Sequence, residues 1–157
     1  MRNKRMLLSW LMAGAALCMQ AQQTAVKAVA DGHYYGARQQ FERFLDETDE
    51  GVKGREDAEA LSLVCDYVLG NPGTADRIGE WTKKHPLSQY ADVLRIFRRN
   101  LLVKGLHFDE ALASFFEDEA NGTETPTVLP YPLTGLIDEV FSYNNVLYRL
   151  AGEKLYD

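Results

Sequence analysis

Hydrophobic residues recur every three or four positions along most of the chain, and strict alternation of hydrophobic and polar residues is scarce. This spacing gathers apolar side chains on one face of a helix, so the pattern predicts α-helices rather than strands. The expected helices cover roughly residues 22–31, 35–46, 57–69, 74–85, 89–104, 109–119 and 135–151.

Turn and capping residues separate these segments. Gly70 ends the helix before it, because glycine takes the left-handed closing conformation without a steric penalty. Thr74, Ser88 and Asp109 are the expected N-caps of the helices that follow them. The acidic run DETDEGVKGRED, residues 46–57, is expected to be an exposed loop.

Three alanines mark an internal repeat. Ala37, Ala75 and Ala111 each stand early in an expected helix, at spacings of 38 and 36 residues, and each follows a turn that contains glycine. Phe41 and Phe115 stand four residues after the first and third of these alanines, on the same helical face. A small residue and an aromatic ring therefore recur together where two helices could cross closely.

The segment from Gly32 to Phe41 resembles the tetratricopeptide repeat, a helix-turn-helix unit of roughly 34 residues. Gly32, Tyr34, Ala37 and Phe41 match the turn glycine, the first aromatic, the small crossing residue and the second aromatic of that family. The resemblance implies an all-α, right-handed superhelical array of helix-turn-helix repeats, an α-solenoid. The phrase HPLSQYAD, residues 85–92, is also similar to units in periplasmic tetratricopeptide proteins of Gram-negative bacteria.

Four features depart from the family pattern. The stretch from Gly105 to Ala111 is one residue longer than that from Gly32 to Ala37, and the turn GNPGTA, residues 70–75, lacks an aromatic residue. In the middle unit Gly79 stands where the second aromatic is expected, and in the next unit Arg98 stands where the family has a small residue. Pro86, eleven residues after Ala75, keeps the proline that closes a unit.

The chain is expected to divide into four parts: an export signal at 1–21, tetratricopeptide-like repeats at 22–119, a proline-rich loop at 120–134, and a last helix at 135–157 that starts an incomplete further repeat. An unpaired first helix leaves an apolar flank uncovered. We therefore expect the N-terminal part of a longer repeat protein, a truncated product, or a protomer that completes itself against a partner. If the chain completes itself against a partner, that partner could be a second copy bound through the last helix.

The first residues have the pattern of a secretory signal. Arg2, Lys4 and Arg5 precede an apolar run from Met6 to Leu17, which is too short to span a bilayer comfortably. Cleavage is expected after Ala21, followed by release into the periplasm or secretion, without stable membrane insertion. A lipoprotein anchored through Cys18 is the alternative, although Leu17 stands where lipoprotein signals have a small residue.

Charge and cysteine content narrow the class of protein. Removal of residues 1–21 takes away three of the 17 basic residues and none of the 23 acidic ones, which leaves a formal charge of −9. That sign disfavours nucleic-acid binding. Cys65, the one remaining cysteine, falls in an apolar helical pattern and is expected to be buried.

No motif in the chain indicates catalysis, a cofactor or a metal. Asp109 and Glu110 are adjacent carboxylates, and acidic residues at the start of a helix complement its dipole. His33, His85 and His107 are all expected in turns, without the spacing of a metal motif. A small exported enzyme or enzyme subunit, using residues that are distant in sequence, is the competing interpretation.

The resemblance implies that the first helices of the repeats line a concave groove that binds a protein or peptide. Asp92, Arg95 and Arg99 are the corresponding positions in the third unit, and Asn145 and Tyr148 are candidates in the last helix. Arg95 and Arg99 lie one turn apart and could hold a partner carboxylate by forked hydrogen bonds. The alternative is a solvated basic face on an acidic protein. The sequence therefore predicts a non-catalytic protein-binding scaffold.

Overall fold

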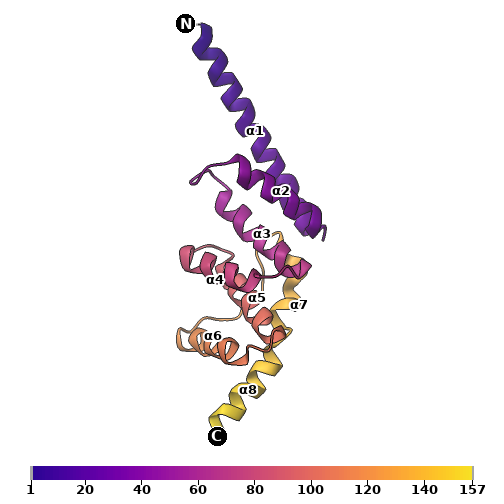
Figure 1. The fold of residues 1–157 in the computed structure, drawn as a ribbon, viewed down its shortest axis with the longest axis vertical. Helices are drawn as coiled ribbons and strands as arrows, with labels where there is room; N and C mark the ends of the chain where they lie inside the picture. The colour runs from indigo at the N-terminus through magenta and orange to yellow at the C-terminus, as the bar shows by residue number, and fades with distance from the viewer. Residues whose placement is uncertain (1, 157) are drawn as a thin grey trace. The chain divides into compact units, whose positions relative to one another are not determined.

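The computed structural model describes residues 2–156, with side chains described at 12–14 and 16–153. Within these residues the chain is all-helical and has no strand (Figure 1). The elements are α1 (Arg2–Ala30), α2 (Tyr34–Glu47), α3 (Arg55–Leu69), α4 (Thr74–Lys84), α5 (Ala91–Lys104), α6 (Phe108–Ala120), the 3₁₀ helix η1 (Leu133–Leu136), α7 (Ile137–Phe141) and α8 (Asn144–Tyr156). The all-α fold class is confirmed, and the superhelical repeat array stays a prediction.

The chain divides into two compact units, Met1–Cys65 and Asp66–Asp157, and α3 crosses the boundary between them. In the first unit α1 packs against α2. Ala37 and Phe41 are fully buried there, as the repeat pattern predicts. The turn between the two helices closes through Gly32, whose φ is 81°, and the His33 amide donates to the Ala28 carbonyl at 2.8 Å.

The segment expected to be an export signal falls in the first part of α1, which runs without a break past the expected cleavage point at Ala21. The side chains of Arg2, Lys4 and Arg5 lie outside the described residues. Within the part of the chain that is described, no helix has the length and apolar character needed to cross a bilayer.

Side-chain hydrogen bonds hold the loop at 48–54. The Arg55 guanidinium donates to the carbonyls of Leu45 and Thr48, at 2.7 and 2.6 Å. The Gln22 amide donates to the Gly54 carbonyl at 2.9 Å. The middle of the acidic run, residues 48–54, is therefore a loop, as expected, whereas its first two residues end α2 and its last three begin α3. Both ends of the loop are fixed by these side-chain hydrogen bonds.

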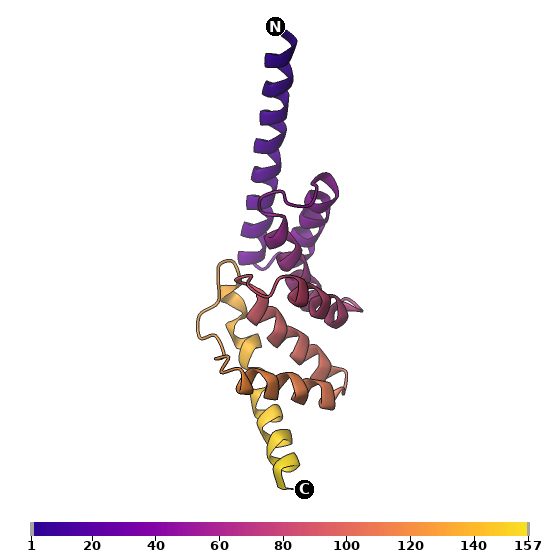
Figure 2. The same ribbon diagram turned by 90° about the vertical axis from the view of Figure 1, so that its left-hand side faces the viewer.

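In the second unit, α5 packs against α4, α6 and α7, and α6 packs against α8. The turn at Gly105 makes α5 and α6 antiparallel neighbours (Figure 2). Their shared core includes Leu102, Val103, Ala111, Leu112, Phe115, Leu147 and Ala151. The second predicted pair of a small residue and an aromatic, Ala111 with Phe115, is thus also buried.

Three buried or half-buried polar groups join α3, α5 and α7. The Tyr67 hydroxyl donates to Glu139 Oε2 at 2.5 Å, and the Asn100 amide donates to the Tyr67 oxygen at 3.1 Å. The same amide also donates to the Glu139 carbonyl at 2.7 Å. Burial, and then the hydrogen bond to Glu139, raise the pKa of the Tyr67 phenol. The ring of Tyr67 stacks on Phe97, with the centroids 4.2 Å apart.

The single last helix expected from Gly135 to Ala151 is wrong, because the chain forms η1, α7 and α8 there. The break falls at Ser142 and Tyr143. Two side chains explain it: the Ser142 hydroxyl donates back to the Asp138 carbonyl at 2.9 Å, and Asn100 occupies the Glu139 carbonyl that Tyr143 would use in a continuous helix. The turn expected in GEKLYD is also wrong, since α8 continues to Tyr156.

The predicted N-caps differ from the observed ones by one or more residues. Gly73 precedes α4 with a φ of 73°, and Thr74 instead donates its hydroxyl to the Asn71 carbonyl at 2.7 Å. His107 precedes α6, which begins before Asp109. Ser88 accepts a hydrogen bond from the Tyr90 amide at 3.3 Å, in the turn before α5. Residues 121–132 are non-helical, as the prolines predict.

Candidate binding cleft

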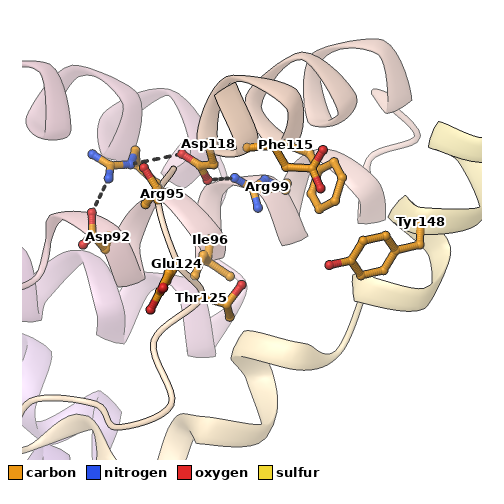
Figure 3. Close-up of a pocket in the computed structure, with 11 residues that line it drawn as sticks. Asp92, Arg95, Ile96, Arg99, Phe115, Asp118, Glu124, Thr125 and Tyr148 are labelled. Carbon is orange, nitrogen blue, oxygen red and sulfur yellow. Dashed lines mark hydrogen bonds and ion pairs between the residues drawn. The ribbon is translucent and has the colours of Figure 1, made fainter. Parts of the chain in front are cut away.

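A cleft of about 200 Å³ lies in the second unit, between α5, α6, the loop that follows α6, and α8 (Figure 3). We call it the α5–α6–α8 cleft. Its lining consists of Asp92, Arg95, Ile96, Arg99, Phe115, Asp118, Glu119, Thr123, Glu124, Thr125 and Tyr148. Four of the five predicted binding residues are therefore brought together in one place.

Helical spacing accounts for this gathering. Asp92, Arg95 and Arg99 follow one another at intervals of three and four on α5, so their side chains share a face. Phe115 and Asp118 are three residues apart on α6, on the face that meets α5. The antiparallel turn at Gly105 sets the two faces against each other.

Asp118 lies between the two guanidinium groups that were predicted to bind a partner (Figure 3). Its Oδ2 accepts a hydrogen bond from Arg99 Nη2. Its Oδ1 is 3.9 Å from Arg95 Nε, and Arg95 Nη2 also donates to Asp92 Oδ1. A carboxylate of this chain thus takes the place that the sequence interpretation gave to a carboxylate of the partner.

Arg99 is a packed residue as well as a charged one. It is only 6% exposed. Its Nη2 is 3.3 Å from the Ser114 carbonyl, and its guanidinium carbon lies 5.6 Å from the centre of the Phe115 ring. Removal of one partner from such a pair is strongly destabilising, because it leaves a charge in a buried place without its counter-charge. Arg95 differs, because about a third of its side chain stays exposed at the edge of the cleft.

Tyr148 of α8 forms another wall of the cleft. Its ring meets Phe115 edge-on, with centroids 5.2 Å apart, and the residue is 58% exposed. Asn145 is exposed on the same helix but is not among the lining residues. Its assignment as a binding residue has no support from the geometry of this cleft.

Sequence reasoning missed Asp118, Glu119 and the loop residues Glu124 and Thr125. A signal for Asp118 was present: in an antiparallel hairpin centred on Gly105, residues on the far turns of α5 and α6 approach each other. No comparable rule places residues 123–125, because the course of a proline-rich loop depends on tertiary packing.

The three histidines and Cys65, the candidates for catalysis or metal binding, stand on different elements of the structure. His33 and His107 stand directly before α2 and α6, and His85 directly follows α4. Cys65 is fully buried, as expected. Among the described residues, no group of three or more His, Cys, Asp or Glu side chains is arranged to hold a metal ion.

Comparisons with protein-family models, with curated proteins and with solved structures found no match for this chain.

Proposed function

We propose that this chain is a non-catalytic protein-binding module, exported by its N-terminal segment, which docks a segment of a partner protein in the α5–α6–α8 cleft. The observation that supports this most is the construction of the cleft. Side chains from α5, α6, α8 and the loop after α6 line one concave site, and Arg95, Asp118 and Tyr148 are among them. The lining is mainly polar and charged, with Ile96, Phe115 and Tyr148 as its apolar or aromatic residues. A concave site with fixed polar groups and an exposed ring suits recognition of a polar segment of a partner.

The polar groups of the cleft suit recognition better than chemistry. Arg99 and Asp118 are paired with each other, and this pairing leaves neither of them positioned as an acid or a base toward a substrate. The described lining contains no histidine, cysteine or serine. Arg95 and Tyr148 remain accessible, and such residues commonly dominate the binding energy at protein interfaces.

Photo-crosslinking tests the docking site. A benzoylphenylalanine at Thr125, an exposed residue of the lining, should give a discrete adduct with a partner protein, identified by mass spectrometry. The same group at Gln39, exposed on α2, serves as the position control. Tyr148→Ala should weaken the Thr125 adduct, because it removes the exposed ring of the lining, whereas Tyr35→Ala at an exposed tyrosine of α2 should not. Adducts that are identical from both positions, or insensitive to Tyr148→Ala, would refute docking at this cleft.

Export is tested separately by the mature N-terminus. Mass spectrometry of the protein from the periplasm or medium should find Gln22 as the first residue, if cleavage follows Ala21. A chain that begins at Met1 in the cytoplasmic fraction alone would refute export and leave the cleft proposal standing.

A further inference from the structure

The charged side chains of the α5–α6–α8 cleft carry an excess of negative charge. Asp92, Asp118, Glu119 and Glu124 contribute four carboxylates, whereas Arg95 and Arg99 contribute two guanidinium groups. The two guanidinium groups are already engaged by Asp92 and Asp118. The charge that the cleft presents to a partner is therefore mainly that of Glu119 and Glu124.

Both of these glutamates are exposed, and neither side-chain carboxylate forms an ion pair or hydrogen bond within the part of the chain that the structure describes. Glu119 lies in the last turn of α6, where a negative charge is disfavoured by the helix dipole. Glu124 lies beside Thr125 on the loop that follows α6, and both residues line the cleft (Figure 3). A cation from a partner could pair with both carboxylates, and it would offset the unfavourable interaction of Glu119 with the helix dipole.

Tyr148 adds an aromatic surface to the same cleft. The Phe115 ring is covered by the Arg99 guanidinium, at 5.6 Å from its centre. Tyr148, at 58% exposure, is the ring in the lining that remains open to a ligand. Lysine and arginine side chains bind favourably over such a face.

From this arrangement we propose that the docked segment of the partner presents lysine or arginine side chains to the cleft, one against Tyr148 at one side and others paired with the carboxylates of Glu124 and Glu119 (Figure 3). This inference rests on the proposed docking function, and it specifies that the docked segment of the partner is positively charged. An acidic segment is disfavoured for a physical reason: its carboxylate would have to displace Asp118 from a buried Arg99, while it faced the two unpaired glutamates.

Amide NMR on the full chain tests the inference with defined probes, Nα-acetyl-arginine amide and Nα-acetyl-glutamate amide. The arginine probe should produce saturable shifts confined to the region of Tyr148, Glu119 and Glu124. The affinity should fall in high salt, because the exposed charges are screened. The combined variant Glu124→Gln with Tyr148→Leu should weaken binding about fivefold or more. Glu80→Gln with Tyr35→Leu, which changes an exposed glutamate and an exposed tyrosine outside the lining, is the matched control.

Three outcomes would overturn the inference. They are saturable binding of the glutamate probe with shifts at Arg95, arginine shifts that spread over the surface and survive in the Glu124/Tyr148 variant, and no shift with either probe. None of these outcomes would overturn docking itself, which the Thr125 crosslink tests independently. A lost crosslink together with retained arginine binding would instead leave a cation site without a protein partner.

Discussion

The Arg98 side chain of α5 lies in the space left by Gly79 of α4. A Cβ atom added at Gly79 would be 3.0 Å from Arg98 Nε and 3.5 Å from its Cδ. At both positions the sequence departs from the tetratricopeptide pattern that it resembles. A large residue is missing on one helix, and a large residue is present on the facing helix, so the two departures compensate in volume. Both residues line an open groove of about 450 Å³ formed with α6.

The first prediction exchanges the sizes of this pair. Gly79→Phe alone should destabilise the fold by about 1–3 kcal/mol, because the ring meets the stem of Arg98. Combined with Arg98→Ala, which restores the small residue of the family pattern, it should recover at least half of that loss. Urea unfolding followed by circular dichroism measures the free energy of unfolding of the wild type, the two single variants and the double variant.

A coupling free energy of about 0.5 kcal/mol or more between the two substitutions is expected for residues in contact. Strict additivity would show that Gly79 and Arg98 do not share space. Gly79→Phe with Lys104→Ala is the matched control, because Lys104 is exposed on the same helix and is not among the residues that line this groove.

Arg99 and Asp118 give a second prediction, about the stability of the α5–α6 hairpin. Asp118→Asn should destabilise by about 2–3 kcal/mol, since it leaves a nearly buried guanidinium without its counter-charge. Asp92→Asn removes the carboxylate of an exposed pair with Arg95 and should cost less than about 1 kcal/mol. Equal effects of the two substitutions in thermal unfolding would contradict the structural role assigned to Asp118.

A third prediction concerns the first unit. Ala37→Asp should destabilise by about 3 kcal/mol or more, because it overfills a fully buried position and places a carboxylate there without a partner. Gln39→Asp, at an exposed position on the same helix, is the control for the lower helix propensity of aspartate. Unchanged melting of the Ala37→Asp protein would refute burial at this crossing.

The extent to which these features follow from the sequence depends on the range of the interactions behind them. Ala37, Phe41, Ala111 and Phe115 were found because residues four apart share a helical face, which is a local rule. The burial of Cys65 followed from the same periodicity. These local patterns predicted α2 to α6 and much of their buried faces, but they did not predict the break between α7 and α8.

Features that depend on distant residues were missed. The break after α7 needs Asn100, which lies 39 residues before the Glu139 carbonyl that it occupies. Asp118 accepts a hydrogen bond from Arg99, 19 residues before it in the sequence. Because this contact occupies Arg99, we propose a basic rather than an acidic partner segment. Hydrophobic periodicity carries no information about either contact, since both are polar and tertiary.

A fourth prediction tests the Gly54 anchor of the loop at 48–54. Gly54 has a φ of 86°, and an added Cβ would lie 2.3 Å from Gln22 Oε1. Gly54→Ala should therefore destabilise the first unit by about 1–2 kcal/mol, through backbone strain and loss of the Gln22 hydrogen bond. Gly51→Ala has a similar φ of 84° but open space around the added atom, so it isolates the backbone contribution. A Gly54→Ala cost no greater than that of Gly51→Ala would show that the Gln22 contact contributes nothing.

The last prediction uses the titration of Tyr67. Burial and the hydrogen bond to Glu139 raise the pKa of Tyr67 in the folded state, whereas the unfolded chain releases this proton near the ordinary value of 10.0. The folded state therefore holds a proton that the unfolded state loses, and this contribution to stability is complete below about pH 10 and declines as the pH rises above it. Tyr67→Phe should cost about 1–1.5 kcal/mol at pH 8, through the lost hydrogen bond to a carboxylate.

The free-energy difference between the wild-type protein and Tyr67→Phe should then shrink between pH 10 and 11, by at most about 1.4 kcal/mol per pH unit. Urea unfolding at several pH values measures it, with Tyr35→Phe as the control for removing an exposed phenol. A difference that stays constant over this range would mean that Tyr67 ionises alike in both states. The polar contact between α3, α5 and α7 would then have to be open to water, which contradicts the burial of Tyr67 and Asn100.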